Sequence, residues 1–312
     1  MKTLEEFRHF YDSTLLADLK ILDRKRETTV ARLAISYFIL LAVAGGLFLG
    51  LRIILEADLA AILSLSICIG VGICLSMLFI GEYAAEFKQT VIGKIVKFMD
   101  ENLDYLPHGF IPESTFIESK IFGPKIKRYE GEDLVSGRIG ATQIQFSEID
   151  VFCEGRVNAR FDGLFLVADF NKDFTGQIIV LPDIAERLLG HVGQNLQALT
   201  KFWGTLIKLE NPEFEKFFAV YGDDQIQARY VLSTSLMERI VEFRKKTNKQ
   251  IFLSFIKSKV YVAVPLDKNL LEPRLAATLL DFGLVKEYFR DLQLAVGIVD
   301  DLNLNTRIWS KE

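Results

Sequence analysis

The stretch that decides the fold is LAISYFILLAVAGGLFLGL, residues 33–51, in which no side chain is charged. A second uncharged stretch, LAAILSLSICIGVGICLSMLFIG, follows at residues 59–81. With a rise of about 1.5 Å per residue, each stretch forms a helix about 30 Å long, which is the thickness of the hydrocarbon core of a bilayer. A buried helix of a soluble protein normally keeps one polar side. The sequence therefore predicts a transmembrane helical hairpin.

A cleaved signal peptide is the alternative for the first stretch, because the triplet Ala42-Val43-Ala44 resembles a cleavage site. Two features argue against cleavage. The segment before the stretch, residues 1–32, is long and carries six acidic side chains, and the triplet lies in the middle of the apolar run. We expect both stretches to be retained as spans.

Basic residues flank the hairpin unevenly. The loop between the two stretches offers only Arg52, whereas the outer flanks are basic: Lys20, Arg24, Lys25, Arg26 and Arg32 precede the first stretch, and Lys88, Lys94 and Lys97 follow the second. The positive-inside rule then places both termini in the cytoplasm. Neither stretch contains an ionisable Asp, Glu, Lys, Arg or His, which argues against a transporter or a pump.

Small residues recur at four-residue spacing within both stretches. They are Ala42, Gly46 and Gly50 in the first stretch, and the pairs Ser66/Gly70 and Gly72/Ser76 in the second. Such a stripe lets two helix backbones approach closely. It serves either the packing of the two hairpin helices or a contact between two chains. The short connecting loop favours the first interpretation.

Helical stripes continue on both sides of the hairpin. Thr3 and Glu6 have capping-box spacing at the start of the first stripe. The first stripe comprises Leu4, Phe7, Tyr11, Leu15, Leu19 and Leu22, and the second comprises Tyr83, Phe87, Val91, Ile95 and Phe98. We predict a cytoplasmic amphipathic helix at 1–32, the hairpin at 33–81, a juxtamembrane helix and linker at 82–111, and a cytoplasmic domain at 112–312.

The cytoplasmic domain carries strand patterns mixed with helical ones. Expected strands are 142–152, 160–170, 177–181, 217–221 and 228–232, together with a hairpin formed by 251–255 and 259–264 around Lys257-Ser258. Expected helices begin at Pro182 and at Ser235, where Ser235 and Glu238 have capping-box spacing, and a last one covers 284–302. Antiparallel hairpins with segregated helices predict an α+β domain.

Composition excludes several classes of function. The 312 residues include 37 Lys and Arg against 41 Asp and Glu, with a net charge of −4, so a nucleic-acid partner is not expected. Three cysteines cannot form a disulfide framework. The G-x-x-G segments at 137–140 and 190–193 are better explained as turns than as nucleic-acid clamps. Phosphate-loop and nucleophile-elbow motifs do not occur in the sequence.

The sequence offers few candidate catalytic or metal-binding residues. His9, His108 and His191 are far apart in the sequence, so we predict no metal or cofactor site. Asp169, Asp173 and Asp183 surround one turn, where an Asp more often bonds its own backbone than a cation. An enzymatic interpretation casts Asp223 or Glu213 as a base and Arg229 as an anion clamp. The alternative, which we favour, makes them turn residues and an internal ion pair.

Four segments carry a resemblance to a known family. They are FDGLFLVADFNKDFTGQIIVLPD (161–183), LENPEFEKFFAVYGDDQIQARYVLSTSLMERI (209–240), SFIKSKVYVAVP (254–265) and VGIVDDLNLNTRIW (296–309). The succession resembles the bacterial family called domain of unknown function 3137. The resemblance implies two membrane spans before a cytoplasmic domain, a location in the bacterial inner membrane, and no assigned activity. Its motif positions, as candidates for binding or structure, are Asp169, Asn171, Lys172, Asp223, Gln225, Arg229, Glu238, Asn303, Asn305, Arg307 and Trp309.

Three functions are compatible with these observations. We expect first a non-enzymatic, membrane-tethered module whose domain binds a protein partner or a second copy of itself, because a tether raises the effective concentration for membrane-bound partners. The second is an enzyme that acts at the membrane on a lipid head group or a small anion. The third is a regulator of membrane stress or of a membrane protease. An exposed apolar patch favours the first, and a deep pocket with converging titratable groups favours the second.

Overall fold

The computed structural model describes residues 2–53, 57–122, 126–154, 159–170, 172–182, 202–302 and 304. The chain forms two compact units. The helical unit comprises Lys2–Lys94 and Glu272–Glu287, and the sheet unit comprises Ile95–Leu271 and Tyr288–Glu312. The segment 272–287, which follows the strands in sequence, is therefore part of the unit built by the N-terminal helices.

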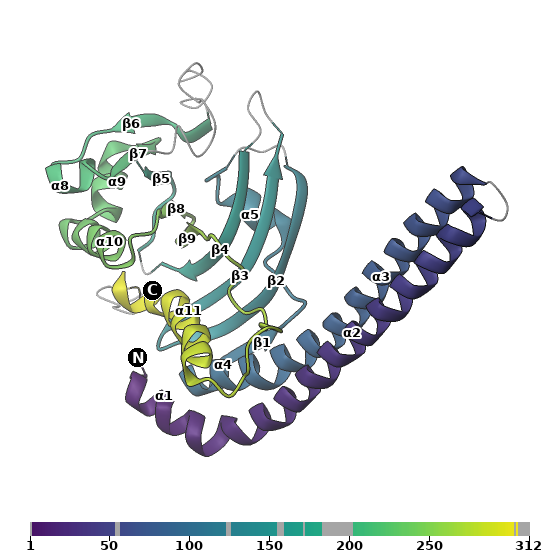
Figure 1. Cartoon of the computed structure of the whole chain (residues 1–312). Coiled ribbons are helices and arrows are strands. Elements are labelled where there is room, and N and C mark those ends of the chain that lie inside the picture. Colours follow the sequence, from purple (N-terminus) through teal and green to yellow (C-terminus); the bar gives the residue numbers. More distant parts are fainter. Residues whose placement is uncertain are drawn as a thin grey trace. The chain divides into compact units, whose positions relative to one another are not determined.

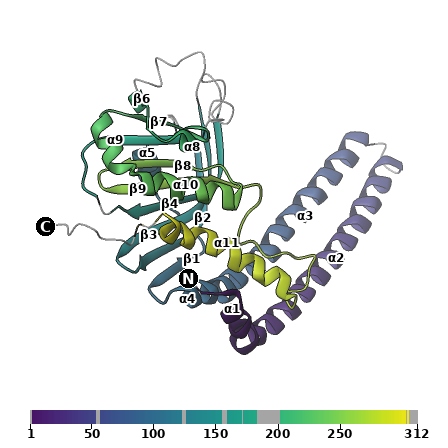
Figure 2. The ribbon, with the colours of Figure 1, turned by 90° about the vertical axis from the view of Figure 1, so that its left-hand side faces the viewer.

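Two long helices lie side by side as a hairpin in the helical unit (Figures 1 and 2). They contain the two uncharged stretches, and both are long and apolar enough to cross a membrane. Only 6% and 11% of their apolar windows are buried, so most of this apolar surface is not covered by the described residues. The elements are α1 (Leu4–Phe10), the π-helical η1 (Tyr11–Leu15), α2 (Leu16–Ile53), α3 (Asp58–Phe87), the π-helical η2 (Lys88–Ile92) and the beginning of α4 (Gly93–Met99).

The small residues of the hairpin fall into two groups. Gly72 and Ser76 of α3 face α2: a Cβ on Gly72 would lie 3.2 Å from the Tyr37 ring, and the Tyr37 and Ser76 hydroxyls are 2.6 Å apart. Close packing inside the hairpin explains this pair. At Gly46 and Gly50, by contrast, an added Cβ would meet no atom of the described residues within 4 Å.

Both flanking stripes are helical, as the spacing predicts. The capping box is present, since Glu6 N–H donates to Thr3 Oγ1 (3.2 Å) and Thr3 N–H donates to Glu6 Oε2 (2.7 Å). The apolar side chains of the first stripe are buried from Phe7 to Leu22. An ion pair of 2.5 Å between Lys25 of α2 and Glu86 of α3 joins the helices beyond their uncharged stretches. The two stripes therefore belong to neighbouring helices.

Buried polar contacts hold the segment 272–287 on α2. The Asp23 carboxylate accepts hydrogen bonds from Leu279 N–H (2.9 Å) and Thr278 Oγ1 (3.0 Å). Arg26 donates to that carboxylate (2.8 Å) and to the Leu275 carbonyl (3.0 Å). Because burial without partners is costly for charged groups, this arrangement fixes the path of the segment.

The sheet unit contains one antiparallel sheet of nine strands among its described residues (Figure 1). The spatial order is β1-β2-β3-β4-β9-β8-β5-β7-β6, so β9 and β8 return between β4 and β5. The strands are β1 (Leu103–Leu106), β2 (Ile126–Ile139), β3 (Thr142–Cys153), β4 (Ala159–Asp169), β5 (Gln177–Pro182), β6 (Thr205–Ile207), β7 (Phe218–Gly222), β8 (Phe252–Ile256) and β9 (Lys259–Pro265).

Aromatic side chains dominate the core on one face of this sheet. Phe116 of α5 (Glu113–Glu118) stacks on Phe122 with ring centroids 5.2 Å apart and also contacts Phe165 of β4. Alternate residues of β3, including Ile149 and Val151, belong to the same cluster. Because side chains alternate across a strand, the neighbours of Ile149 in β3 point to the other face.

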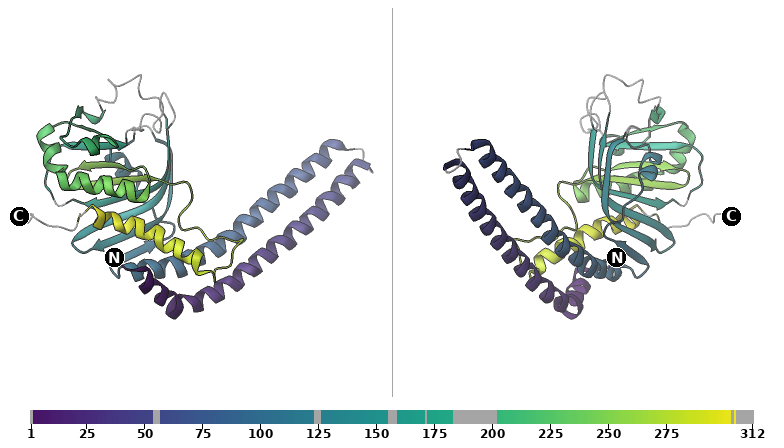
Figure 3. Two further views of the ribbon diagram at one scale, coloured as in Figure 1. Left: turned by 60° about the vertical axis from the view of Figure 1, so that its left-hand side comes forward. Right: turned by 90° about the vertical axis from the view of Figure 1, so that its right-hand side faces the viewer.

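The remaining helices follow the strands of the second half. The helices α10 and α11 lie side by side (Figure 3), and Lys246 of α10 pairs with Asp301 of α11 at 3.0 Å. The bounds are α8 (Pro212–Glu215), α9 (Gln225–Val231), α10 (Thr234–Thr247) and α11 (Phe282–Asp301).

Most of the predicted elements are confirmed, and two details are wrong. The mixed α+β class holds, and the strands at 142–152, 160–170, 177–181 and 217–221 and the hairpin at 251–264 are present. The expected strand at 228–232 lies instead largely within α9. Helix α10 is preceded by Ser233, whose side chain makes no capping hydrogen bond, so the expected box at Ser235 is absent. Pro182 ends β5, and the rest of the helix predicted from Pro182 towards Leu189 lies outside the described residues.

Candidate functional site

The predicted site residues that the structure describes are distributed over several elements. Asp169 ends β4 opposite Lys259 of β9, and Lys172 lies in the following loop. Glu238 is exposed on α10. Asp223, Gln225 and Arg229 lie at and within α9. Asn171, Asn303, Asn305, Arg307 and Trp309 lie outside the described residues.

Helix α9 begins at a capped turn. The Asp224 carboxylate accepts hydrogen bonds from Ile226 N–H (2.7 Å) and Gln227 N–H (3.3 Å), which satisfies two backbone donors of the first turn. Gln225 is the first helical residue and is exposed. Asp223 was expected to be a turn residue, and here it directly precedes the capping residue of a helix.

Lys172 lies at the other end of α9. Its ammonium donates to the carbonyls of Tyr230 (2.5 Å) and Val231 (3.4 Å) and lies 4.9 Å from the centre of the Tyr230 ring. Burial lowers the pKa of Lys172. A cation at the carbonyl end of a helix is favourable, so Lys172 fastens the loop after β4 to α9.

Asp223 takes part in a hydrogen-bond chain beneath α9. The Gln177 amide donates to Asp223 Oδ1 (3.3 Å) and to the Phe202 carbonyl (3.2 Å), while Lys120 donates to Gln177 Oε1 (2.6 Å). Gly204 has φ +89°, and a Cβ there would lie 2.4 Å from the Gly222 carbonyl oxygen. Asp223 therefore has a structural role here, because its carboxylate accepts a hydrogen bond from Gln177 of β5.

The groups of the enzymatic interpretation do not share one site. Arg229 pairs with Glu210 at 3.3 Å, and both side chains are exposed. Glu213 pairs with Lys245, which lowers the pKa of Glu213. Acid-base catalysis requires titratable groups that converge on one reacting atom. Asp223, Glu213 and Arg229 instead have separate partners.

An open hollow, which we call the α9 hollow, lies beside this helix. It has a volume of about 650 Å³ and is lined mainly by apolar atoms of Phe174, Ile226 and Tyr230. Ile226 is 80% exposed and Tyr230 is 47% exposed. Ile226 and Tyr230 are four residues apart and therefore share one side of α9. Ile226 does not stand out in the sequence, although the sequence contains this apolar pair at four-residue spacing.

Polar groups around the α9 hollow already have partners. The Gln227 side-chain oxygen accepts hydrogen bonds from Thr175 N–H (3.2 Å) and Gly176 N–H (3.0 Å). Ser258 donates to Asp173 Oδ1 (2.9 Å). The apolar surface of the hollow is therefore surrounded by polar groups that are held in place by hydrogen bonds to one another.

A second hollow, of about 350 Å³, lies over β2, β3 and β4 and is strongly acidic. We call it the acidic hollow. Arg160 pairs with Asp150 (3.0 Å) and with Asp162 (3.1 Å). Burial acts against ionisation of Asp150, but hydrogen bonds and charges from Arg160 and Arg128 hold its pKa below the usual value. The charged side chains that line the hollow are Glu130, Glu132, Glu148, Asp150, Asp162 and Arg160.

Glu148 is the buried member of the acidic hollow. Its side chain accepts a hydrogen bond from Leu270 N–H at 3.0 Å, and only 7% of the residue is exposed. Burial raises the pKa of Glu148 to about 7, the hydrogen bond from Leu270 opposes that rise, and the charges of Asp133, Glu132 and Asp162 add to it. Glu148 faces Glu132 directly across the β2–β3 pair.

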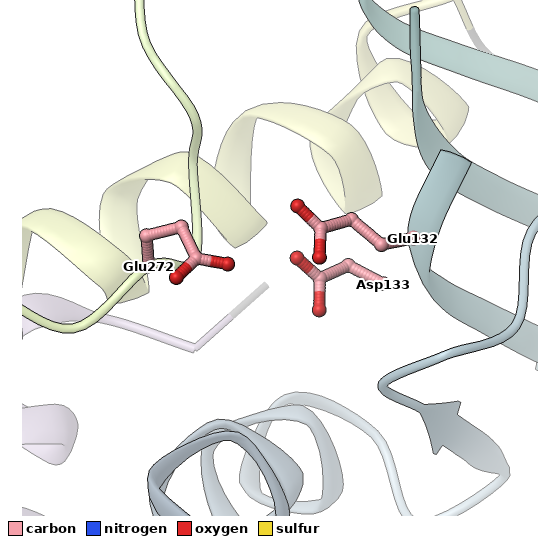
Figure 4. Close-up of side chains that lie close together, drawn as sticks. All are labelled: Glu132, Asp133 and Glu272. Carbon is pink, nitrogen blue, oxygen red and sulfur yellow. The ribbon is translucent and has the colours of Figure 1, made fainter. Parts of the chain in front are cut away.

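A bulge in β2 positions two of these acids. The pairing with β3 shifts between Glu132 and Val135, and Asp133 has φ +61°. The Tyr105 hydroxyl donates to Asp133 Oδ1 at 2.5 Å. Figure 4 shows the carboxylates of Glu132 and Asp133 projecting from the same part of β2. A bulge therefore brings two successive carboxylates to one side of the strand, where regular pleating would separate them.

The family model described as "Protein of unknown function (DUF3137)" matches residues 159–304, from β4 to the residues after α11. This part of the chain belongs to the DUF3137 family. All residues that line the α9 hollow lie inside the DUF3137 region, whereas Glu148 lies before it.

Curated proteins and solved structures show little further similarity to this chain. No curated protein matches the chain. A crystal structure of the mycobacterial trehalose monomycolate transport factor A, TtfA, aligns with a TM-score of 0.32 and 12% sequence identity. The alignment covers 65% of this chain and 95% of TtfA. At this similarity it carries no argument about function.

Proposed function

We propose that this protein is a bacterial inner-membrane anchor for a cytoplasmic protein-binding domain. The helices α2 and α3 cross the membrane with both termini in the cytoplasm, and the sheet unit binds one specific partner protein through the α9 hollow. The length and uncharged character of the two stretches support the membrane part, and the basic flanks support its orientation.

The observation that carries the binding part is the exposure of Ile226. At 80% it is the most exposed large apolar side chain among the described residues, including those of the uncharged stretches. Complete burial of an isoleucine is worth about 1.5–3 kcal/mol. Tyr230 and Phe174 extend the apolar surface beside it. Rigid apolar and aromatic side chains beside a hollow are typical of the central contacts of protein interfaces.

The tether strengthens this proposal. A domain that is fixed to a membrane meets membrane-bound partners at a high effective concentration, so a small contact surface is sufficient for binding. The α9 hollow is open and mainly apolar, whereas a site for a small anion requires converging donors. We therefore place a protein side chain, rather than a head group, in the hollow.

Photocrosslinking in living cells tests the binding surface. A photoreactive amino acid at Tyr230 of the full-length protein should give one adduct with a single identified protein. Ile226→Asp should reduce that adduct at least tenfold, because a buried charge without a partner costs several kcal/mol. Gln225→Asp, at the neighbouring exposed position, is the matched control and should leave the adduct unchanged.

Two results would contradict the binding proposal. One is equal adduct yield from the Ile226→Asp and Gln225→Asp proteins. The other is an adduct that consists only of two copies of this chain, which would indicate self-association.

Reporter fusions test the orientation independently. A fluorescent protein that folds only in the cytoplasm should be bright when it follows Glu312. Alkaline phosphatase, which is active only in the periplasm, should be active when inserted after Ala57. The opposite pair of results would overturn the proposed topology, and a full-length protein that is soluble without detergent would overturn the membrane anchor itself.

A further inference from the structure

The connector 266–271 follows β9 and leads into the helical unit at Glu272. Three polar contacts between described residues hold it in the sheet unit, and the side chains of Leu270 and Leu271 are buried. Leu266 N–H donates to the Asp162 carbonyl (3.0 Å), Lys268 pairs with Asp291 (2.9 Å), and Leu270 N–H donates to Glu148 (3.0 Å). Of the three, only the last depends on a group that is buried and titratable.

Glu148 lies in an unusual electrostatic position. Glu132 and Asp133 face it from β2, Asp162 faces it from β4, and Asp150 follows two residues later on the same side of β3. Arg160, the cation that lines the acidic hollow, pairs with Asp150 and Asp162. The backbone N–H of Leu270 in the connector therefore donates a hydrogen bond to a carboxyl group that is surrounded by other acidic side chains.

We propose that the connector 266–271 is a proton-controlled latch that closes on the protonated side chain of Glu148 and opens when that side chain is ionised. The latch goes beyond the proposed binding function and does not depend on it. Only a proton moves: water takes it from the Glu148 carboxylic acid when the latch opens, and water returns it when the latch closes.

Two opposing effects decide whether the latch closes at low or at high pH. The hydrogen bond from Leu270 favours the ionised carboxylate in the closed state, whereas burial and the neighbouring acids disfavour it. Burial has the larger effect, because the pKa of Glu148 rises to about 7 in the closed structure from an ordinary value of 4.5. The closed state therefore holds the proton more tightly than a hydrated, open state does. By linkage, acidification closes the connector and alkalinisation opens it.

Hydrogen–deuterium exchange of the full-length protein in detergent tests the latch. The measurement follows peptides that cover 266–271 at pH 6, 7 and 8, after correction for the intrinsic pH dependence of exchange. In the wild-type protein the protection of these amides should fall by about tenfold from pH 6 to pH 8, given the two pKa values above. Peptides from β4 and β9 should keep their protection and show that the sheet is intact.

Two variants isolate the role of Glu148. Glu148→Gln retains an oxygen that accepts from Leu270 but has no charge, so the connector should stay protected and independent of pH. Glu130→Gln, at an exposed position that lines the same hollow, should keep the wild-type pH dependence. Wild-type protection that does not change with pH would overturn the latch, and so would a tenfold fall that persists in Glu148→Gln. If the Glu148→Gln sheet lost its protection, the wild-type pH series and Glu130→Gln would still decide the matter.

Discussion

We expect the substitution Asp23→Ala to lower the free energy of unfolding of the helical unit by about 4 kcal/mol, the range found when one partner of a buried ion pair is removed. The Asp23 side chain is 11% exposed and the Arg26 side chain is 13% exposed. Removal of the carboxylate leaves the Arg26 guanidinium without its pairing to Asp23, and it leaves the Leu279 N–H and the Thr278 hydroxyl without their acceptor. Desolvated donors without acceptors are costly, so the loss should be large.

Thermal unfolding of the full-length protein in detergent measures this effect, and limited proteolysis within 272–287 shows where the structure opens. Asp23→Asn, which keeps one acceptor oxygen but no charge, should fall between the wild type and Asp23→Ala. The matched control is Asp12→Ala, which breaks the exposed Arg8–Asp12 pair and should cost less than about 1 kcal/mol. Equal losses in Asp12→Ala and Asp23→Ala would show that burial of the Asp23 contacts contributes nothing.

The second large effect concerns the pH dependence of global stability. Burial raises the pKa of Glu148 to about 7 in the folded protein, against 4.5 in the unfolded chain. Between these two values the folded state binds more protons than the unfolded state. The free energy of unfolding should therefore decrease as the pH rises from about 4.5 to 7, by about 3 kcal/mol in total, and become level with respect to this group above pH 7.

Urea unfolding of the full-length protein in detergent at pH 5, 6, 7 and 8 measures this dependence. Glu148→Gln should lack the decrease, so its stability relative to the wild type should increase by about 2.5 kcal/mol from pH 5 to pH 8. Glu130→Gln, an exposed carboxylate of the same hollow, should follow the wild-type curve. Parallel curves for Glu148→Gln and the wild type would contradict the prediction.

The elements that the sequence predicted well are those with a strong local pattern. The uncharged stretches at 33–51 and 59–81 are long helices because neither a charged side chain nor a proline interrupts them. The hairpin of β8 and β9 follows from alternating apolar residues around Lys257 and Ser258, which both adopt positive φ. Local rules are sufficient in such cases because the interacting residues are close in sequence.

The expected strand at 228–232 failed because residues distant in sequence stabilise a helix there. Aromatic and β-branched residues at Tyr230 and Val231 favour an extended chain locally. The hydrogen bonds from Lys172 to the carbonyls of these two residues stabilise the helical end instead. Lys172 was noted as a motif position, but its contact with α9 spans 58 residues of sequence and could not be inferred from spacing.

The candidate site residues also divide into those that the local sequence indicates and those that only the folded chain reveals. Asp223 and Arg229 stood out in the sequence as charged residues of a turn, and the structure gives them partners in separate places. Ile226 did not stand out, because an apolar residue in a helix is more often buried than exposed. Its exposure depends on which side of α9 faces the sheet, and no local pattern specifies that.

The sequence alone determined that two stretches are uncharged helices long and apolar enough to cross a membrane, and that an α+β domain follows them. It could do so because chain length, charge and alternation act through neighbouring residues. Only the tertiary structure decided that Asp23 holds Leu279, 256 residues later, and that Glu148 holds Leu270, 122 residues later. Burial gives both contacts their energy, and the burial of a carboxylate depends on segments that meet only in the folded chain.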